Sequence, residues 1–267
     1  MGLSPLVSRY DNLLLDLDGC VWVGGRLTRR ASDAISELRA ARKHVAFVTN
    51  DPCHSPEEYV RKLWSLGIQA SLEEVVTVGA AIQHFLAERG PGRAYVIGSP
   101  ALFRHVADAG YRIVNHVESA AEAHVLVVAG HDDFNFGELQ DGTRAVLAGA
   151  EMIAAGRDRT FPGEDGLRPG TGAIVAALEY ATERTARLVG KPDPQIFFTA
   201  LDRLNGGPTL MVGDHLVADL TGAVAAGLEA AIVLTGVTTR EQAAAATEPA
   251  PVAVAADLYA LVTGNER

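Results

Sequence analysis

The sequence predicts an α/β protein in which a parallel sheet with helical crossovers is interrupted by a second α/β unit. Short apolar runs alternate with helical patterns along almost the whole chain, as expected when helices connect parallel strands. The length of 267 residues fits one large or two modest domains. Both observations favour a folded α/β chain with a sizeable buried core.

The first part of the chain is expected to end near residue 78. The apolar run 12–17 predicts the first strand, and the amphipathic stretch at about 29–42 predicts the helix that follows it. A second strand is expected at 45–48. The sequence Ser-Pro-Glu-Glu then offers a capping serine, a proline at the first helical position and a glutamate three residues after the serine. It therefore predicts a helix over 55–67.

Residues 79–184 are expected to form the second α/β unit. Its predicted elements are strands at 94–97, at 125–128 and around 152, and helices at 99–110, 136–147 and 171–181. The turn-rich stretch 156–170 is interpreted as a functional loop or a domain connection.

The alternation resumes in the last part, 185–267, which is expected to complete the first unit. Its predicted elements are strands at 186–189, 209–212 and 230–233, a helix after Pro194, a helix that ends before Gly227, and a short final strand and helix.

Composition excludes several classes of partner. The chain has 23 basic and 33 acidic residues, and its formal charge of -10 disfavours binding to nucleic acid through phosphate contacts. No apolar run approaches the roughly 18 residues that a membrane span needs. Two cysteines, Cys20 and Cys53, cannot build a disulfide framework, and the N-terminus lacks the pattern of a signal peptide. We expect a cytoplasmic protein that binds neither nucleic acid nor membrane.

Polar residues collect at the carboxyl ends of four predicted strands, where open parallel sheets bind their ligands. They are Asp16 and Asp18, Thr49 and Asn50, Lys191, and Asp214. Each motif alone is also typical of an ordinary turn or helix cap. Their joint placement at strand ends favours one shared pocket.

The residue types in this pocket indicate phosphoryl transfer. Asp16, Asp18, Asp214 and Asp219 would repel one another unless a hard cation held them, and Mg²⁺ prefers such oxygen ligands. One carboxylate can attack phosphorus, and a second can protonate the leaving oxygen and later deprotonate water. A hydroxyl, a backbone N–H and the Lys191 ammonium can hold the phosphoryl oxygens.

At this point the sequence resembles the haloacid dehalogenase (HAD) superfamily. The matching motifs are DLDG at 16–19, FVTN at 47–50, GKPDP at 190–194 and GDHLVADL at 213–220. The insertion before the third motif, with TFPGEDGLRPGTGAI at 160–174, resembles the NagD-like phosphatases of subfamily IIA. The resemblance implies a Rossmann-like core at 1–78 and 185–267, with helices on both sheet faces, and an inserted α/β cap of the second type at 79–184.

The resemblance also implies a role for each matching residue. Asp16 would be the nucleophile and a Mg²⁺ ligand, and Asp18 the general acid and base that also binds the metal through its backbone carbonyl. Asp214 would be the remaining direct ligand, with Asp219 supporting the metal site from outside the ligand set. Thr49, the backbone of Asn50, and Lys191 would bind phosphate. The implied activity is Mg²⁺-dependent hydrolysis of small phosphomonoesters such as sugar phosphates, nucleotide monophosphates or glycerol phosphate, and a homodimer is suggested by the resemblance alone.

The chain departs from the usual motifs at three positions. Asp51 stands where the family often has a second asparagine, and His215 and Ala218 replace the arginine and threonine that are common in the fourth motif. The metal ligands are kept, but the residues around them have changed.

Three residues of the second unit are candidates for substrate specificity. Arg157 and Asp158 follow the strand near residue 152, and His131 follows the strand that ends at Val128. Loops at such positions select substrates in many enzymes, although solvated loop charges are equally compatible with the pattern.

Two other functions remain open from the sequence. A phosphotransferase or mutase would use the same aspartyl-phosphate but return the phosphoryl group to an organic acceptor. A non-catalytic phosphometabolite-binding protein would keep the pocket without turnover. Release of free phosphate from p-nitrophenyl phosphate, absent in an Asp16→Asn variant, would separate these functions.

Overall fold

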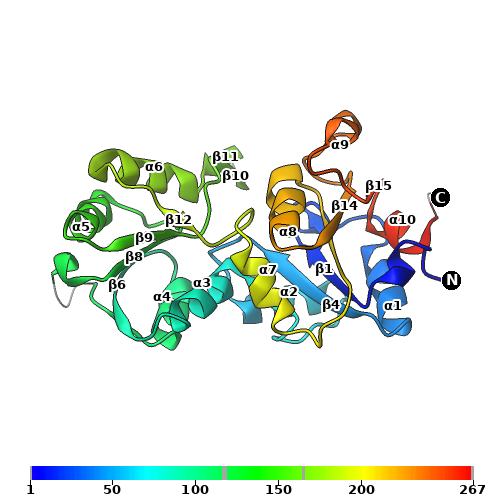
Figure 1. The fold of residues 1–267 in the computed structure, drawn as a ribbon, viewed down its shortest axis with the longest axis horizontal. Coiled ribbons are helices and arrows are strands. Elements are labelled where there is room, and N and C mark those ends of the chain that lie inside the picture. The colour runs from blue at the N-terminus through cyan, green and yellow to red at the C-terminus, as the bar shows by residue number, and fades with distance from the viewer. Residues whose placement is uncertain (1, 116–118, 164–165, 266–267) are drawn as a thin grey trace. The chain divides into compact units, whose positions relative to one another are not determined.

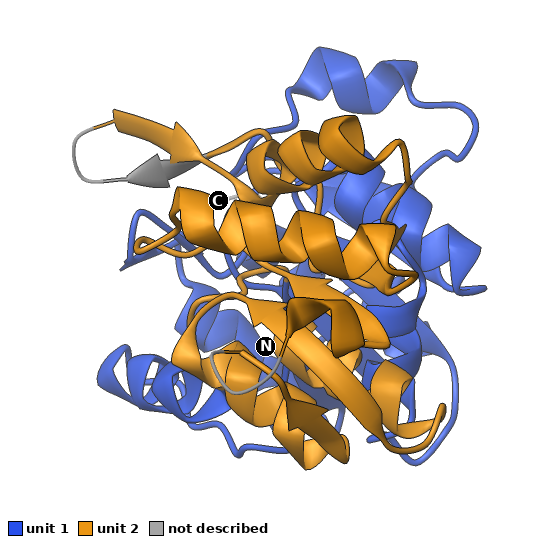
Figure 2. Cartoon of the chain, turned by 90° about the vertical axis from the view of Figure 1, so that its left-hand side faces the viewer, with its two compact units in different colours: residues 1–49, 56–76, 191–267 blue, residues 50–55, 77–190 orange. Residues whose placement is uncertain are grey.

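The structure is a computed structural model that describes residues 2–115, 119–163 and 166–265. The chain forms two compact units, which Figure 2 shows in different colours. Unit 1 comprises residues 1–49, 56–76 and 191–267, and unit 2 comprises residues 50–55 and 77–190. The units thus change at 76/77 and 190/191, where the sequence analysis placed the changes at 78/79 and 184/185.

Unit 1 is built on a six-stranded sheet (Figure 1). Its strands, in spatial order, are β5 (Val75–Thr77), β4 (His44–Thr49), β1 (Asn12–Asp16), β13 (Thr209–Gly213), β14 (Glu229–Val233) and β15 (Ala253–Ala255). Numbered along the chain, these strands have the order 3-2-1-4-5-6, which is the Rossmann arrangement. The order reverses between β1 and β13, and ligands bind at such a switch point.

Helices cover both faces of the unit 1 sheet. The first face packs against α1 (Ala31–Ala40), α2 (Pro56–Ser65) and α10 (Leu258–Thr263) in one apolar cluster. The helix α7 (Gln195–Leu201) contacts β4, and α8 (Gly222–Ala225) contacts β14, both with residues outside that cluster. The remaining helical segments are α9 (Arg240–Ala245), a turn of 3-10 helix η1 (Val7–Arg9) and a turn of π-helix η3 (Leu216–Thr221).

Side-chain alternation in β1 explains this two-faced burial. Leu13 and Leu15 belong to the cluster with α1, α2 and α10, whereas Leu14, also fully buried, points to the other face. Residues 12–16 are therefore all buried, as is typical of a parallel strand with helices on both sides.

Unit 2 has its own five-stranded parallel sheet. Its strands, in spatial order, are β12 (Arg187–Leu188), β9 (Glu151–Ala154), β8 (Val125–Val128), β6 (Gly92–Ile97) and β7 (Tyr111–Ile113). Helices α5 (Phe136–Leu147) and α6 (Thr171–Thr182) lie on one side of it, and α3 (Val78–Ala87) and α4 (Pro100–Asp108) lie on the other (Figure 1). A turn of 3-10 helix, η2 (Ala120–Glu122), precedes β8.

The predicted fold class is confirmed, since a Rossmann-like core and an inserted α/β unit are both present. Among the residues described, none of the helices is both long and apolar enough to span a bilayer.

One local expectation was wrong, and two hairpins were not predicted. The strand predicted at 186–189 pairs with β9 in unit 2 and not with the unit 1 sheet. The stretch 156–170, interpreted as a functional loop or a domain connection, contains a hairpin of β10 (Thr160–Gly163) and β11 (Gly166–Pro169). Glu164 and Asp165 of the family segment 160–174 lie outside the described residues. A second hairpin, β2 (Trp22–Val23) and β3 (Arg26–Leu27), follows the first strand and was not expected.

Candidate active site

The candidate site lies at the carboxyl ends of β1 and β13, the switch point of the unit 1 sheet. Asp16 is the last residue of β1, and Asp214 directly follows β13. The two strands are neighbours in parallel register, with Leu15 opposite Val212. Residues almost 200 positions apart in the sequence are thereby brought to one edge of the sheet.

Three carboxylates and one ammonium group form the centre of this site. Asp16, Asp214 and Asp219 each have a carboxylate oxygen within 4.8 Å of the others. The Lys191 Nζ donates to Asp16 Oδ1 at 2.5 Å and to Asp219 Oδ1 at 2.7 Å. All four residues are buried, with 7% of Asp16, 6% of Lys191, 4% of Asp214 and 1% of Asp219 exposed. We call these four residues the carboxylate cluster.

Asp219 is held by bonds to both of its carboxylate oxygens. Its Oδ1 accepts from Lys191, and its Oδ2 accepts from the backbone N–H groups of Asp214 (3.1 Å) and His215 (3.0 Å). A carboxylate with this many donors is held in one orientation. This geometry suits a residue that supports the metal ligands and the loop after β13.

Two glycines make room for the Asp214 carboxylate. A Cβ atom added to Gly19, whose φ is +91°, or to Gly236 would overlap this carboxylate. The Val237 N–H, which follows Gly236, donates to Asp214 Oδ2 at 2.7 Å. The backbone thus approaches Asp214 closely because these two positions carry no side chain.

Burial and charge shift the pKa values in the cluster. Burial raises the pKa of Asp16 well above its ordinary value, because loss of hydration outweighs the attraction of Lys191. Burial also raises the pKa of Asp214. Burial alone would lower the pKa of Lys191, but the charges of Asp16 and Asp219 outweigh it and raise that pKa above its ordinary value.

The cluster suits a hard divalent cation. Three carboxylates against one ammonium leave a formal excess of two negative charges among buried groups. Burying uncompensated charge is expensive, and an oxygen-ligated cation would remove the excess. None of the described residues donates a hydrogen bond to Asp16 Oδ2 or Asp214 Oδ1, so these two oxygens fit the role of metal ligands.

The structure places the other predicted site residues in different surroundings. Thr49 is buried at the end of β4, next to β1 in the sheet. Asp18 is exposed and lies in the loop after β1, outside the carboxylate cluster. Asn50 directly follows Thr49 in the chain but belongs to unit 2.

Sequence analysis missed Trp22 as a neighbour of Asp18. Its indole Nε1 donates to Asp18 Oδ1 at 2.7 Å. The tryptophan lies in the β2–β3 hairpin, where Gly24 and Gly25 both have positive φ. A Gly-Gly pair between two short strands is a hairpin signal, and it could have placed Trp22 close to the loop that carries Asp18.

His215 caps the helical turn that carries Asp219. Its Nδ1 accepts from the backbone N–H groups of Val217 (3.1 Å) and Ala218 (3.2 Å). An imidazole can therefore serve the capping role that oxygen-bearing side chains usually have. Although positions 215 and 218 depart from the usual motif, the turn that carries Asp219 is still capped.

The specificity candidates lie in unit 2. Arg157 forms a two-bond ion pair with Glu179, and these bonds lower the pKa of Glu179. His131 Nε2 lies 3.2 Å from Glu138 Oε2, close enough for an ion pair but not aligned as a hydrogen bond. Asp158 has an exposed side chain, and its backbone carbonyl accepts from the Gly172 N–H at 3.0 Å.

Comparison with known protein families supports the motif assignments. Residues 13–112 match the family described as haloacid dehalogenase-like hydrolase. Residues 188–261 match a second family, described as HAD-hydrolase-like.

Two curated relatives and two solved structures cover most of the chain. D-glycerol 3-phosphate phosphatase of Mycobacterium tuberculosis is 39% identical over 238 residues, which cover 88% of this chain but 66% of the relative, about two thirds of its length. A crystal structure of glycerol phosphate phosphatase from that organism, in complex with magnesium, has a TM-score of 0.91 at 37% identity and covers 97% of this chain and 78% of that chain. Acid sugar phosphatase of Staphylococcus aureus (strain USA300) is 32% identical over 88% of this chain and 90% of its own length. NagD from E. coli K-12 has a TM-score of 0.85 at 25% identity, over 93% of this chain and 97% of that chain.

Proposed function

This chain belongs to the haloacid dehalogenase-like hydrolases, within the NagD-like subfamily IIA, and on that premise we propose that it hydrolyses small phosphomonoesters through an aspartyl-phosphate on Asp16. Its enzyme class is that of a metal-dependent phosphoric monoester hydrolase. The observation that carries the proposal is the carboxylate cluster, in which three buried carboxylates share one lysine at the switch point of the sheet.

Asp16 is the proposed nucleophile. Lys191 donates to its Oδ1 at 2.5 Å, so the carboxylate is held in one orientation for attack on phosphorus. Asp16 and Asp214, with the backbone carbonyl of Asp18, would hold Mg²⁺, and Asp219 would support them. When bound, the ion neutralises negative charge on the carboxylates and on the substrate phosphate. Lys191 adds a fixed positive charge beside the same oxygens.

Asp18 is the proposed general acid and base. The P–O bond to the leaving alcohol breaks as the bond between Asp16 and phosphorus forms, and Asp18 gives its proton to the leaving oxygen. In the second half-reaction Asp18 takes a proton from water, which attacks the phosphoryl group and restores the Asp16 carboxylate. The exposure of Asp18 agrees with contact to solvent water and to a diffusing substrate.

Thr49, the backbone N–H of Asn50, and Lys191 are the proposed phosphate-binding groups. Thr49 ends the strand next to β1, and Lys191 already donates two bonds in the cluster. A hydroxyl, an amide and an ammonium group together can follow the charge on the phosphoryl oxygens as the reaction proceeds.

Unit 1 is proposed to be the catalytic core and unit 2 the cap that selects the substrate. Arg157, Asp158 and His131 are the proposed specificity residues of this cap. Because relatives are named D-glycerol 3-phosphate phosphatase and acid sugar phosphatase, we propose a small polyol or sugar phosphate as substrate. A cytoplasmic location, a homodimer and the absence of nucleic-acid or membrane partners complete the proposal.

The test is phosphate release from a panel of phosphomonoesters, measured with Mg²⁺ and with a chelator. We expect free phosphate with Mg²⁺, no turnover after chelation, and the highest kcat/KM on one polyol or sugar phosphate in the panel. Equal molar release of alcohol and phosphate, with glycerol or glucose present as acceptor, identifies a hydrolase. Phosphate transferred to the acceptor would identify a phosphotransferase or mutase, and binding without turnover would identify a phosphometabolite-binding protein.

A further inference from the structure

The hydrogen bond between Trp22 and Asp18 joins a buried side chain to an exposed one. Trp22 is fully buried, whereas Asp18 lies at the surface of the loop after β1. Without a partner, an exposed aspartate would sample several rotamers. The Trp22 indole, which donates to Asp18 Oδ1 at 2.7 Å, restricts the carboxyl group to one of them.

Trp22 is itself fixed on several sides. Its backbone carbonyl accepts from the Gly19 N–H at 2.7 Å, and its own N–H donates to the Leu17 carbonyl at 3.1 Å. The Tyr59 ring stacks with its indole at a centroid distance of 6.2 Å and an interplanar angle of 6°. The Lys62 Nζ lies 4.0 Å from the centroid of the same indole. Tyr59 and Lys62 are three residues apart on α2, so one face of that helix supports the tryptophan.

The chemistry of the indole determines which oxygen of Asp18 is left to face the substrate. An indole N–H is a donor only, so Oδ1 must accept whether Asp18 is charged or neutral. Oδ1 is thereby engaged by Trp22, and Oδ2 is the oxygen left to face the substrate. Building on the function proposed above, we propose that Trp22 is a positioning residue that presents Asp18 Oδ2 to the leaving oxygen of the substrate.

The proposal predicts an effect that depends on the leaving group. When an alkyl phosphate reacts, the departing alkoxide must take a proton from Asp18 as the P–O bond breaks. When p-nitrophenyl phosphate reacts, the nitrophenolate leaves without a proton. Loss of the Trp22 N–H should therefore slow the first reaction far more than the second. A hydrogen bond that only stabilises the loop would affect both reactions equally.

The experiment compares Trp22→Phe with Trp64→Phe. These are the two tryptophans of the chain, and each indole N–H makes one hydrogen bond, since Trp64 Nε1 donates to the Ala70 carbonyl at 2.8 Å. For each variant, kcat/KM is measured on glycerol 3-phosphate and on p-nitrophenyl phosphate. This parameter reports transfer of the phosphoryl group to Asp16, the step in which the leaving group departs.

We expect Trp22→Phe to lower kcat/KM about tenfold on glycerol 3-phosphate and less than about twofold on p-nitrophenyl phosphate. Trp64→Phe should leave both values within about twofold. An equal change on the two esters in Trp22→Phe, or no change, would overturn the proposal. Wild-type protein that hydrolyses neither ester would overturn the proposed function and this inference together, so the two failures are distinguishable.

A second variant covers the case in which Trp22→Phe does not fold. In the Trp64→Phe background Trp22 is the one remaining tryptophan, so it can be replaced biosynthetically by benzothienylalanine. This analogue keeps the shape of the indole but has sulfur in place of the N–H. The same preferential loss on glycerol 3-phosphate is expected, and an unchanged ratio between the two esters would again overturn the proposal.

Discussion

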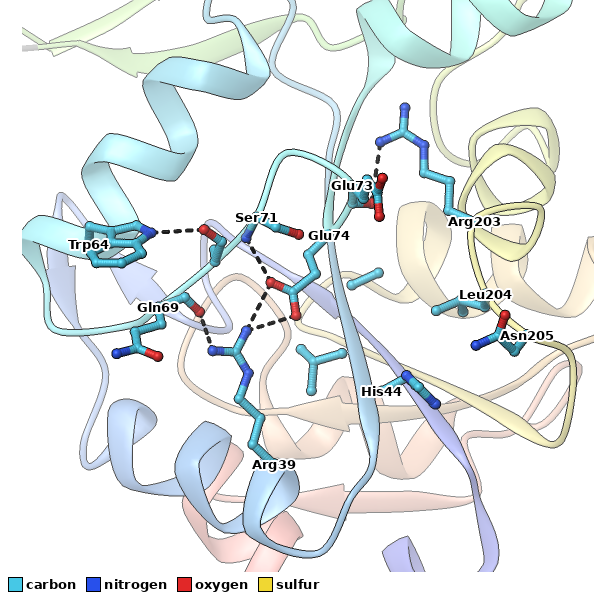
Figure 3. Close-up of a pocket in the computed structure, with 13 residues that line it drawn as sticks. Arg39, His44, Trp64, Gln69, Ser71, Glu73, Glu74, Arg203, Leu204 and Asn205 are labelled. Atoms are coloured by element: carbon cyan, nitrogen blue, oxygen red, sulfur yellow. Dashed lines mark hydrogen bonds and ion pairs between the residues drawn. The ribbon is translucent and has the colours of Figure 1, made fainter.

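Charged side chains are compensated differently at the two ends of the unit 1 strands, which we call the carboxyl edge and the amino edge of the sheet. At the carboxyl edge, three carboxylates of the cluster share one lysine. At the amino end of β4, which begins at His44, lies a cavity of about 610 Å³ (Figure 3). It is lined by Arg39, His44, Val45, Ala46, Trp64, Gln69, Ala70, Ser71, Glu73, Glu74, Arg203, Leu204 and Asn205. We call it the amino-edge pocket.

Each arginine of the amino-edge pocket is matched by local acceptors. Arg39 Nη2 donates to both carboxylate oxygens of Glu74, at 2.9 and 3.0 Å, and its Nη1 donates to the Gln69 carbonyl. Arg203 Nη1 donates to the Val75 carbonyl at 2.9 Å and lies within 3.5 Å of the Leu72 and Glu73 carbonyls. Figure 3 shows the contact with Glu73. These bonds link α1 and the segment just after α7 to residues 69–75, so their role is to stabilise the fold of unit 1.

The ion pair of the amino-edge pocket and the carboxylate cluster differ in how their charge is compensated. The side chains of Arg39 and Glu74 are each 30% exposed and paired one to one, so water and the partner both compensate the charge. The carboxylate cluster is almost fully buried and keeps an excess of negative charge. Because a bound cation would compensate such an excess, the cluster is the part of unit 1 that we propose as the functional site.

The largest expected effect is loss of activity in Asp16→Asn. The amide cannot act as the nucleophile, so kcat should fall by at least about a thousandfold. The melting temperature should not fall by more than a few degrees, because one of three mutually repelling carboxylates is removed. Glu74→Gln is the matched control in the amino-edge pocket, and its kcat should stay within about twofold. Comparable losses in the two variants would remove the distinction between the edges.

Lys191→Met should have the next largest effect, on stability in the absence of metal. The substitution leaves Asp16 and Asp219 buried without their ammonium partner, and breaking a buried pair costs about 3–5 kcal/mol of unfolding free energy. Urea denaturation in the presence of a chelator measures this loss. Lys62→Met, which removes a less buried lysine, should cost less than about 1 kcal/mol. Equal costs would contradict the electrostatic account of the cluster.

Mg²⁺ should stabilise the folded protein through the carboxylate cluster alone. At 100 times its Kd the ion should raise the unfolding free energy by about 2.7 kcal/mol, and a chelator should reverse the effect. The increase should vanish in Asp214→Asn and persist in Arg39→Met. Thermal denaturation over a magnesium titration measures it, and an increase that survives in Asp214→Asn would place the ion elsewhere.

The smallest expected effect is the coupling between Arg39 and Glu74. A double-mutant cycle of Arg39→Met and Glu74→Gln should give a coupling below about 1 kcal/mol, because the pair is partly exposed. Added salt should reduce it further. A coupling of about 3–5 kcal/mol, the size of the stability loss expected in Lys191→Met, would show that the ion pairs at the two edges are equally strong.

Most of the fold was predictable because parallel strands carry a strong local signal. Strands β1, β4, β13 and β14 are continuous apolar runs, and each was predicted close to its observed position. The sheet to which a strand belongs has no such signal. The strand at 187–188 is short, and nothing in its residues distinguishes pairing with β9 from pairing within unit 1.

The sequence was sufficient to predict those site residues that lie at the ends of strands. Asp16 and Asp214 follow apolar runs, so their positions could be inferred from topology. The partners of these residues could not be inferred. The bonds from Lys191 to Asp219, from His215 to the turn that follows it, and from Trp22 to Asp18 depend on side-chain directions that the spacing of residues does not specify.

The central claim is that Asp16 carries the phosphoryl group during turnover. The most direct measurement is mass spectrometry of the enzyme after acid quench during steady-state hydrolysis of p-nitrophenyl phosphate. The account predicts one added phosphoryl group on the peptide that contains Asp16, and none in Asp16→Asn or after chelation of Mg²⁺. A phosphoryl group on another residue, or active turnover with no phosphorylated enzyme at any quench time, would contradict it.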